Sequence, residues 1–356
     1  MKIFLLAGEA SGDQHGSELI SEIRSAHPEW ELCAWGGDKM EAAGARLLSH
    51  YKNRNIMGLV EVIKNLRTIR GFMQQARKDI EKERPDKVVF IDNPGFNLPL
   101  AKYAKSLEIE VHWYIAPKAW AWNKRRIKAM KKVIDQLYVI FPFEVGFFKK
   151  HGMPSTYVGN PTQKAVNQFL KNKPTPLSYK KTIALLPGSR PAEVEALLPN
   201  FIRATREVEG NEIDILVAGA SSLDQAFYDK IFQREGVQAK IRFNQTFDIL
   251  HTASQTGGYA LVASGTATLE TALLGCPQLV AYKVSPLTYW AGKTLIGIKW
   301  VSLVNILLNR MAVQEYLQDV SVGSLAMGIK EMKSDGLDVE LNFQFSNMQK
   351  KDFLFK

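Results

Sequence analysis

The chain has 356 residues, of which 46% are hydrophobic and 23% charged, and its formal net charge is +10. This composition excludes an intrinsically disordered protein. Two cysteines are too few for a disulfide framework or a four-ligand zinc site, which favours a reducing compartment. Residues 1–175 hold 28 basic and 18 acidic side chains, whereas residues 176–356 hold 18 of each. This asymmetry predicts two domains, one of which meets an anionic partner: nucleic acid, a membrane surface or a phosphorylated substrate.

Short apolar runs alternate with longer helical patterns along the whole chain. The runs that predict strands are 3–7, 87–91, 111–115, 136–140, 182–186, 213–218, 259–263 and 278–282. Most are continuously apolar, which is typical of parallel strands covered by helices on both faces. Helical periodicity spans 16–26, 60–83, 192–209 and 266–274. The alternation predicts an α/β fold with two Rossmann-like parallel-sheet domains that face each other across a cleft.

Two prolines and four lysines interrupt the apolar pattern at Lys171–Lys181, which we interpret as a linker. The expected domains are therefore 1–170 and 182–320, followed by a tail, 321–356, whose last residues fit no regular element. No stretch reaches 18 apolar residues, so we expect no membrane span. The first residues lack a full signal-peptide pattern, and we expect a cytoplasmic protein.

The first strand is followed by a glycine-rich turn, residues 8–13, before a helix expected to start near Asp13. Glycines allow a tight turn, and the N–H groups of the helix would point at the cleft. The candidate cleft residues are Glu9, Ser11, Gly12 and Asp13. The alternative is an ordinary strand-to-helix turn without a ligand.

A hydrophobic segment at 55–67 has apolar residues on more than one helix face and is followed by basic residues. This pattern fits a surface that contacts a bilayer or acyl chains, with an ordinary core helix as the alternative. The candidate residues are Met57, Val60, Ile63, Lys64 and Arg67.

Asp92 ends the apolar strand 87–91 and is a candidate general base, although it could equally cap the Asn-Pro-Gly turn that follows. The next candidate segment is Trp113–Trp122, which holds three of the seven tryptophans. Six bases follow at Lys124–Lys132. Such a segment could stack nucleic-acid bases or lie at a membrane interface, or it could be core aromatics followed by a solvated helix.

In the second half, two loops that follow strands offer groups for binding anions. Gly188, Ser189 and Arg190 could clamp a diphosphate, because arginine makes forked, charge-assisted hydrogen bonds. The second loop contains Ser264, Gly265 and Thr266 at the start of a helix, and Glu270 one turn further along could accept a hydrogen bond from a ribose diol. The alternatives are a surface arginine and a capped helix with a solvated glutamate. The six histidines show no ligand spacing, so we expect neither a metal site nor a cofactor.

Taken together, these segments resemble the lipid-A-disaccharide synthase family, inverting glycosyltransferases of the GT-B architecture. The matching stretches occur in family order: LAGEASGD (6–13), MGLVEV (57–62), IDNPGFN (91–97), WYIAPKAWAW (113–122), FPFE (141–144), LLPGSRPAEVE (185–195), ASGTATLE (263–270) and VSLVNILLNR (301–310).

The resemblance implies transfer from UDP-2,3-diacylglucosamine to 2,3-diacylglucosamine 1-phosphate without a metal, giving a β-1′,6-linked disaccharide and UDP. It places Asp92 in the catalytic acidic motif and the acylated acceptor in the first domain. The residues that it assigns to the donor in the second domain are Arg190, Ser264, Thr266, Glu270 and Asn305. It also implies a peripheral protein on the anionic inner face of the inner membrane, and helices at the chain end that can exchange within a homodimer. The tail beyond about 320 does not follow that pattern.

Two alternatives stay open at this stage. A UDP-N-acetylglucosamine 2-epimerase would have a similar two-domain fold but would need no acyl-binding surface. A nucleic-acid-binding module would use Trp113–Lys132. On the synthase interpretation, the positive charge of the first half attracts anionic lipid headgroups and the acceptor phosphate, with no nucleic acid as partner.

Overall fold

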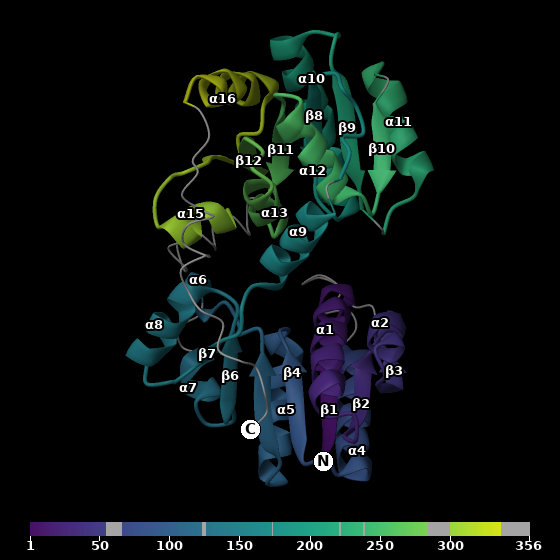
Figure 1. Cartoon of the computed structure of the whole chain (residues 1–356), viewed down its shortest axis with the longest axis vertical. Coiled ribbons are helices and arrows are strands. Elements are labelled where there is room, and N and C mark those ends of the chain that lie inside the picture. Colours follow the sequence, from purple (N-terminus) through teal and green to yellow (C-terminus); the bar gives the residue numbers. More distant parts are fainter. Residues whose placement is uncertain are drawn as a thin grey trace. The chain divides into compact units, whose positions relative to one another are not determined.

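A computed structural model describes residues 1–54, 66–122, 126–172, 174–220, 222–237, 239–283 and 300–335. These residues divide into two compact units, one formed by Met1–Pro161 and the other starting at Thr162. Each unit contains one parallel β-sheet (Figure 1). The expected α/β class with parallel sheets is therefore confirmed.

The first sheet has seven strands in the order β3-β2-β1-β4-β5-β6-β7. Their bounds are β1 (Lys2–Ala7), β2 (Glu31–Gly36), β3 (Arg46–His50), β4 (Lys87–Ile91), β5 (Glu110–Tyr114), β6 (Gln136–Val139) and β7 (Thr156–Tyr157). All pairs are parallel, and β1 lies against β4 with Ala7 opposite Ile91. Every residue of β4 is buried, which explains the apolar run that follows Lys87.

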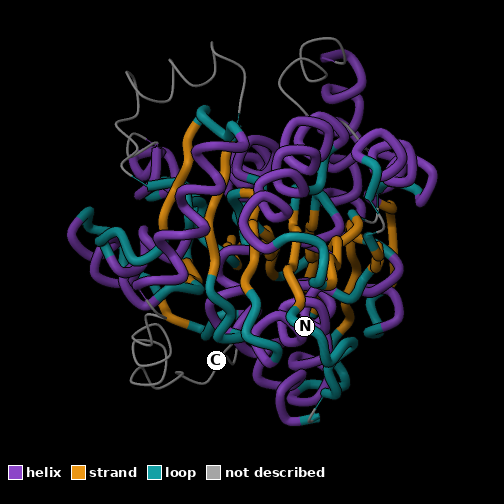
Figure 2. The backbone as a smooth tube through the Cα atoms, turned by 90° about the horizontal axis from the view of Figure 1, so that it is seen from above, coloured by secondary structure: helices purple, strands orange, loops and turns teal. Residues whose placement is uncertain are grey.

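Helices cover both faces of this sheet, as Figure 2 shows for the strands in orange. They are α1 (Ala10–Ala26), α2 (Asp38–Ala42), α4 (Leu66–Glu83), α5 (Pro94–Ser106), α6 (Ala119–Trp122), α7 (Arg126–Met130) and α8 (Pro142–Lys150), with a 3₁₀ turn at Tyr51–Arg54. Successive side chains of β1 enter two different cores: Phe4 and Leu6 pack in one, and Ile3 and Leu5 in the other. A strand between two helical layers must be apolar on both faces.

The second sheet has six strands in the order β10-β9-β8-β11-β12-β13, again all parallel. Its strands are β8 (Thr182–Leu186), β9 (Asp214–Gly219), β10 (Lys240–Phe243), β11 (Tyr259–Ala263), β12 (Gln278–Tyr282) and β13 (Gln314–Leu317). The helices of this unit are α9 (Pro161–Lys171), α10 (Pro191–Glu209), α11 (Gln225–Glu235), α12 (Thr246–Gln255), α13 (Ala267–Leu273), α15 (Leu303–Leu308) and α16 (Val322–Asp335).

All eight strands expected from the sequence are present, each within one residue of its expected ends. Five further strands were not expected, and four of them (β3, β7, β10 and β13) are the outer strands of the two sheets. An outer strand is covered less completely, so its sequence carries no continuous apolar run. The first helix also begins earlier than expected, at Ala10.

The chain passes between the units at Pro161 and Thr162, before the expected linker. Residues 174–181 pack on the second unit: the Leu177 N–H donates to the Thr252 hydroxyl (2.9 Å), and the Ser178 hydroxyl donates to Asp214 (2.6 Å). In the expected tail, α16 is a regular helix whose buried face, including Leu325 and Ile329, joins the core beside α10. The residues after 335 lie outside the described part. None of the described helices is long and apolar enough to cross a membrane.

Candidate active site

In both sheets, the strand order reverses next to the first strand of the sheet. The reversal falls between β1 and β4 in the first sheet and between β8 and β11 in the second. In open α/β sheets, ligands bind outside the carboxyl ends of the strands at such a switch point. The sequence-predicted loops that begin at Gly8, Asp92, Gly188 and Ser264 follow these four strands. The structure thus places most of the candidate residues at the two switch points.

Asp92 lies in a strained turn at the end of β4. Its φ angle is +45° and that of Asn93 is +42°, a left-handed conformation that costs about 1–3 kcal/mol for a residue other than glycine. The Asp92 N–H donates to the Tyr114 carbonyl (3.1 Å). The fully buried Asn97 amide donates to the carbonyls of Asp92 (2.8 Å) and Ile91 (3.3 Å). The turn is therefore held from two sides, and it fixes the direction of the Asp92 side chain.

The environment of the Asp92 carboxyl favours its protonated form. Burial raises its pKa, and the charge of Glu9 acts in the same direction, whereas the charge of Lys118 and the backbone N–H of Asn93 lower it. A carboxylate that has lost solvation accepts a proton more readily than one in water. The net direction of these effects is a raised pKa for the Asp92 carboxyl, and its catalytic role stays a prediction.

The turn after β1 contacts the turn that carries Asp92. A Cβ atom on Gly8 would lie 2.4 Å from the Nδ2 atom of Asn93, so the Asn93 side chain as it stands packs against the glycine. Glu9 is the N-cap residue of α1 and accepts a hydrogen bond from the exposed Ser11 hydroxyl (2.8 Å). Glu9 and Ser11 thus lie near Asp92 at the same edge of the sheet.

Gly12 and Asp13 have a different setting from the one expected. Because α1 begins at Ala10, Ser11, Gly12 and Asp13 belong to its first turn and not to a loop before the helix. The Asp13 carboxylate is 2% exposed and caps α2. It accepts hydrogen bonds from the N–H groups of Gly37 (2.7 Å), Lys39 (3.2 Å) and Met40 (3.1 Å). Gly12 lets α1 pack against β1, because a Cβ there would lie 3.1 Å from Ala7.

Two charged residues of the first unit were missed by the sequence analysis: Lys118, which acts on the Asp92 carboxyl, and Glu144, on which Lys118 also acts. Glu144, at the start of α8, is 1% exposed and accepts hydrogen bonds from Trp120 Nε1 (2.8 Å) and from the N–H groups of Phe141 (3.0 Å) and Ile140 (3.2 Å). Burial raises its pKa to about 7. Lys118 lies in the loop after β5. The sequence did contain a signal for both residues, because each is the one charged residue of an otherwise apolar stretch. Lys118 stands in WYIAPKAWAW, and Glu144 stands in FPFE.

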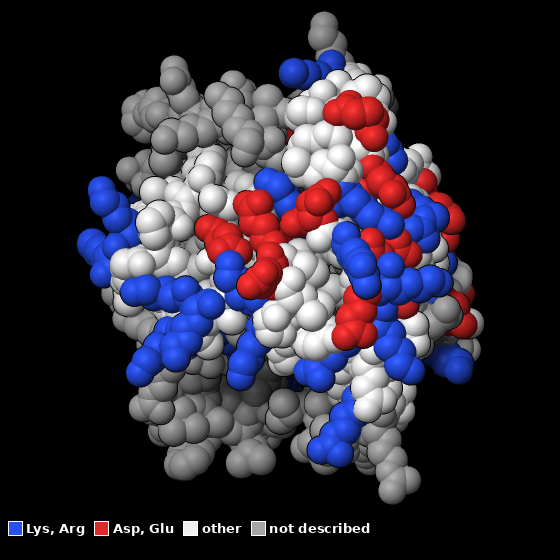
Figure 3. Space-filling view, turned by 90° about the horizontal axis from the view of Figure 1, so that it is seen from below, with Lys and Arg blue, Asp and Glu red and all other residues white. Residues whose placement is uncertain are grey.

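The aromatic and basic segment separates into two parts. Trp113 is fully buried in the core, so its ring cannot stack on a nucleic-acid base. Lys128, Lys131 and Lys132 are exposed on and after α7, and Lys149 and Lys150 are exposed at the end of α8. In Figure 3, blue side chains gather at the left, the side on which Figure 1 draws α7 and α8, with few acids among them.

The remaining members of two predicted groups lie outside the described residues. They include Met57, Val60, Ile63 and Lys64 of the hydrophobic segment, together with Lys124 and Arg125 of the basic run. Arg67 is the second residue of helix α4.

The loop after β8 carries Arg190 as the N-cap residue of the 19-residue helix α10. The Arg190 side chain is 69% exposed, and its guanidinium lies 3.6 Å from the Glu193 carboxylate. Glu193 also accepts a hydrogen bond from the Ser189 N–H (3.1 Å). Gly188 has a φ angle of +114°, and a Cβ there would lie 2.6 Å from Glu193 Oε2. Arg190 is therefore available to an anion, while Glu193 fixes the loop.

At the loop after β11, the Ser264 hydroxyl donates to the Val301 carbonyl (2.9 Å), and Gly265 and Thr266 are exposed. Gly265 has a φ angle of +149° with open space around its Cα atom. Glu270 is partly buried, and its carboxyl makes no hydrogen bond or ion pair with the residues described. Burial raises the pKa of this carboxyl to about 7. An unpaired carboxyl in such a place is available to a ligand hydroxyl.

The Asn305 side chain is fully buried and all its hydrogen bonds are made within the protein. Its Nδ2 donates to the Val313 carbonyl (2.8 Å) and to Glu315 Oε1 (2.7 Å), and its Oδ1 accepts from the N–H groups of Ala312 (2.7 Å) and Val313 (2.9 Å). Asn305 thus shapes the turn beside α15. Its contact with the donor stays a prediction, and it would be made through the backbone of that turn.

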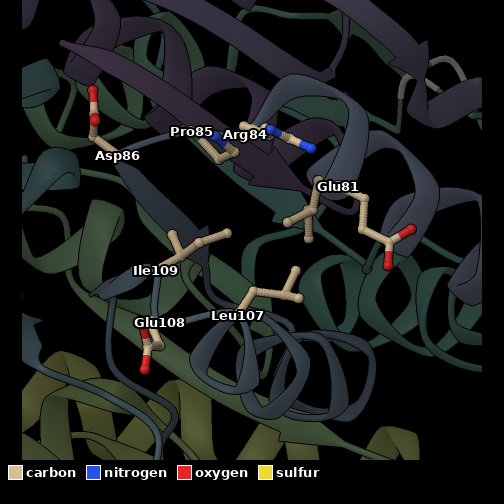
Figure 4. A pocket seen from close by; sticks show the side chains of 8 residues that line it. Glu81, Arg84, Pro85, Asp86, Leu107, Glu108 and Ile109 are labelled. Atoms are coloured by element: carbon tan, nitrogen blue, oxygen red, sulfur yellow. The ribbon is translucent and has the colours of Figure 1, made fainter.

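A pocket of about 750 Å³ lies at the opposite edge of the first sheet, where β4 and β5 begin. Figure 4 shows Arg84, Asp86, Leu107 and Ile109 among its lining residues. On this face, acids and bases are interspersed (Figure 3) and several are paired, as in Lys2–Glu83 and Arg46–Glu83, both 2.6 Å. Because the pocket lies where β4 begins and Asp92 lies where β4 ends, the pocket is separate from the candidate site. No group of three residues suited to a metal ion occurs in the described part of the chain.

Comparison with known proteins assigns the family. The sequence profile described as "Lipid-A-disaccharide synthetase" matches residues 3–335. The lipid-A-disaccharide synthase of Nitrosococcus oceani is 35% identical over 336 residues, covering 91% of this chain and 85% of that protein. The chain belongs to the lipid-A-disaccharide synthase family. Another relative, the lipid-A-disaccharide synthase of Syntrophus aciditrophicus, is 36% identical over 324 residues, which are 89% of this chain and 84% of that protein.

Solved structures share the fold of this family member at low sequence identity. The UDP co-structure of S. aureus MnaA has a TM-score of 0.60 at 14% identity, covering 98% of this chain and 91% of that one. Acinetobacter baumannii MurG has a TM-score of 0.54 at 12% identity, with 98% and 96% covered. The fold is that of GT-B glycosyltransferases and related epimerases, and the family makes this chain a glycosyltransferase. The epimerase alternative is not favoured, because the relatives at 35–36% identity are synthases.

Proposed function

We propose that this protein transfers 2,3-diacylglucosamine from its UDP donor to 2,3-diacylglucosamine 1-phosphate. The products are the β-1′,6-linked lipid A disaccharide 1-phosphate and UDP, formed with inversion at the anomeric carbon. The family supports the reaction class. The observation that carries the mechanism is Asp92, a carboxyl held in a strained turn at the switch point of the first sheet.

On this proposal, Asp92 is the general base. Its carboxylate takes the proton of the acceptor hydroxyl as the hydroxyl oxygen attacks the anomeric carbon. The bond between that carbon and the diphosphate breaks, and the electron pair leaves with UDP, as in a single inverting displacement. The raised pKa of Asp92 supports this role, because a base works best when its pKa approaches the working pH.

The second unit binds the donor and stabilises the charge that develops on UDP. Arg190 and the amino ends of α10 and α13 face that charge, assisted by Gly188, Ser189, Ser264, Gly265 and Thr266. Glu270 accepts a hydrogen bond from the ribose, and Asn305 shapes the neighbouring turn. The 69% exposure of Arg190 and the unpaired carboxyl of Glu270 support these roles.

The first unit binds the acylated acceptor at a membrane. Each CH₂ group of an acyl chain contributes about 0.8 kcal/mol when it leaves water, so the substrates stay in the bilayer. Met57, Val60 and Ile63 would meet the acyl chains, while Lys64 and Arg67, with the exposed lysines of α7 and α8, attract the anionic inner face of the inner membrane. The protein is then a peripheral cytoplasmic enzyme, with a homodimer possible.

Mass spectrometry of the product tests the function directly. The purified protein is incubated with both acylated substrates, and we expect the mass of the disaccharide 1-phosphate together with UDP. The Asp92→Asn variant is the matched control and should form neither. Turnover of UDP-N-acetylglucosamine alone, without disaccharide, would instead make the protein an epimerase.

Vesicle binding tests the membrane surface. Replacing Met57, Val60 and Ile63 together with Ser should weaken co-sedimentation with vesicles that contain anionic lipid. Met327→Ser is the control, because Met327 is a 55% exposed apolar side chain on α16. Unchanged binding of the triple variant would assign the segment to the protein core.

A further inference from the structure

The loop between β5 and α6 exposes a single side chain. Ile115, Ala116, Pro117 and Ala119 are buried, and only Lys118 among these residues is exposed. Ile115 has a φ angle of +66°, a strained value for a β-branched residue, and the Ala116 N–H donates to the Tyr138 carbonyl (3.1 Å). The backbone of the loop is thus held by the sheet, so the backbone position of Lys118 is defined.

Glu144 attaches the far end of this loop to the next turn of the unit. One carboxylate oxygen accepts the hydrogen bond from Trp120 Nε1 (2.8 Å), and the other accepts the N–H groups of Phe141 (3.0 Å) and Ile140 (3.2 Å). The Trp120 ring also packs edge-on against Phe143, with 5.0 Å between ring centroids. Because Glu144 is almost fully buried, these contacts are shielded from water and restrain the position of α6.

Lys118 lies one strand away from Asp92. β4 and β5 are neighbours, with Ile91 opposite Tyr114, so Asp92 and the loop of Lys118 leave the sheet at the same edge. Lys118 forms no ion pair within the described residues. Two charged residues act on the Asp92 carboxyl: Lys118 from the β5 side favours the ionised form, and Glu9 from the β1 side favours the protonated form. Lys118 also acts on Glu144.

We infer that Lys118 is a positioning residue for catalysis, whose charge keeps the Asp92 carboxylate ionised against Glu9, and that Glu144 holds the loop that carries it. The inference rests on the proposed role of Asp92 as the base. A base accepts a proton only in its ionised form, so removal of the Lys118 charge lowers the active fraction of enzyme at acidic and neutral pH.

The titration of Asp92 can be followed without measuring activity. In protein labelled with ¹³C at the aspartate carboxyl carbons, the resonance lost in Asp92→Asn identifies Asp92. We expect its titration midpoint to move to higher pH in Lys118→Met and to stay in place in Lys118→Arg. Lys102→Met, which removes an exposed lysine of α5, is the control and should leave the midpoint unchanged. An unchanged midpoint in Lys118→Met would overturn the inference.

The pH dependence of kcat/KM then links the charge to the reaction. The acidic limb of the Lys118→Met profile should move to higher pH together with the midpoint, with the alkaline limb unchanged. If Asp92→Asn keeps near-normal turnover, the base assignment fails, while the carboxyl titration still decides the influence of Lys118. If Asp92→Asn is inactive and the midpoint does not move, the base assignment stands and the inference fails.

A double-mutant comparison tests the part played by Glu144. If Glu144 acts by holding Lys118, Glu144→Gln should move the Asp92 midpoint in the wild-type background and move it no further in Lys118→Met. Equal shifts in both backgrounds would remove Glu144 from the proposal.

Discussion

The two switch points have the same topology but use opposite kinds of residue at their left-handed positions. In the first unit these positions hold Asp92 and Asn93, both of which have side chains, whereas in the second they hold Gly188 and Gly265. A side chain at positive φ costs energy that glycine avoids. The contrast agrees with the proposed function, in which the first site acts through its side chains and the backbone of the second approaches the donor.

The charges at the two sites follow the same division. Near Asp92 the charged groups act on each other, and burial shifts the pKa of Asp92 and of Glu144 upward. In the second unit Arg190 is exposed, and the Glu270 carboxyl makes no hydrogen bond or ion pair with other residues in the described part. This division fits one unit that moves a proton and another that holds a nucleotide with few groups, which explains why residues 176–356 need no net charge.

The largest expected effect comes from Asp92, whose carboxyl group and whose strained backbone can be tested separately. Asp92→Gly should lose about 10²–10⁴-fold in kcat because the base is gone. It should also gain about 1 kcal/mol in free energy of unfolding, since glycine tolerates the φ angle of +45°. Denaturant unfolding and single-turnover kinetics measure the two effects. Asp92→Asn removes the same carboxylate but keeps the strain, so it should be as inactive as Asp92→Gly and less stable than it. Retained activity in both variants would end the contrast between the units.

Arg190→Ala should have the next largest effect. Loss of a charge-assisted contact to phosphate costs about 1.5–3 kcal/mol, equivalent to roughly 10–100-fold in kcat/KM for the UDP donor. Arg234→Ala is the matched control, because Arg234 is 58% exposed on α11 of the same unit and should be neutral for activity. Equal kinetics in both variants would remove Arg190 from the donor site.

The two glycines should respond differently to alanine. Gly188→Ala introduces both the strain of φ +114° and a Cβ atom 2.6 Å from Glu193, whereas Gly265→Ala introduces strain with no close neighbour. We expect Gly188→Ala to cost about 1–3 kcal/mol in unfolding free energy, and more than Gly265→Ala. Thermal unfolding with and without UDP measures both stability and nucleotide binding. Equal losses would show that the contact with Glu193 is unimportant.

The last prediction is a gain in stability that depends on pH. The pKa of Glu270 rises from 4.5 to about 7 on folding, so the folded state binds the extra proton between these values and loses stability as pH rises through them. Glu270→Gln should therefore be more stable than the wild type by up to about 3 kcal/mol at pH 8, with the difference shrinking toward pH 5. Thermal unfolding at both pH values provides the comparison. A difference independent of pH would contradict the proposed cause.

The central strands could be predicted from the sequence because burial on both faces requires an unbroken apolar run. β4, β8 and β11 are buried along their whole length, and each was expected at its observed bounds. The outer strands could not be predicted in this way. All four residues of β13 are only partly buried, and β7 has two residues, so neither leaves a periodic pattern.

Within the site, position was predictable but the partners of each side chain were not. Asp92 and Arg190 follow apolar strands, so their places at the carboxyl ends could be inferred from neighbouring sequence. Asp13 looked the same in sequence, yet its carboxylate caps a helix that begins 25 residues later. The contacts of Glu144 depend in the same way on Trp120, which belongs to helix α6 and follows a different strand. Such contacts are set by tertiary packing, which local sequence does not encode.

The pairing of β1 with β4 also has a consequence for folding kinetics. Ile3 lies opposite Lys87, 84 residues further along the chain, and the turn of Asp92 is held only once that pair and its neighbour β5 are in place. Pairing between such distant segments is slow, because a long loop must close before its contacts form. During refolding, recovery of catalytic activity should lag behind recovery of the helical circular dichroism signal. The return of activity would then report the time at which the distant strands pair.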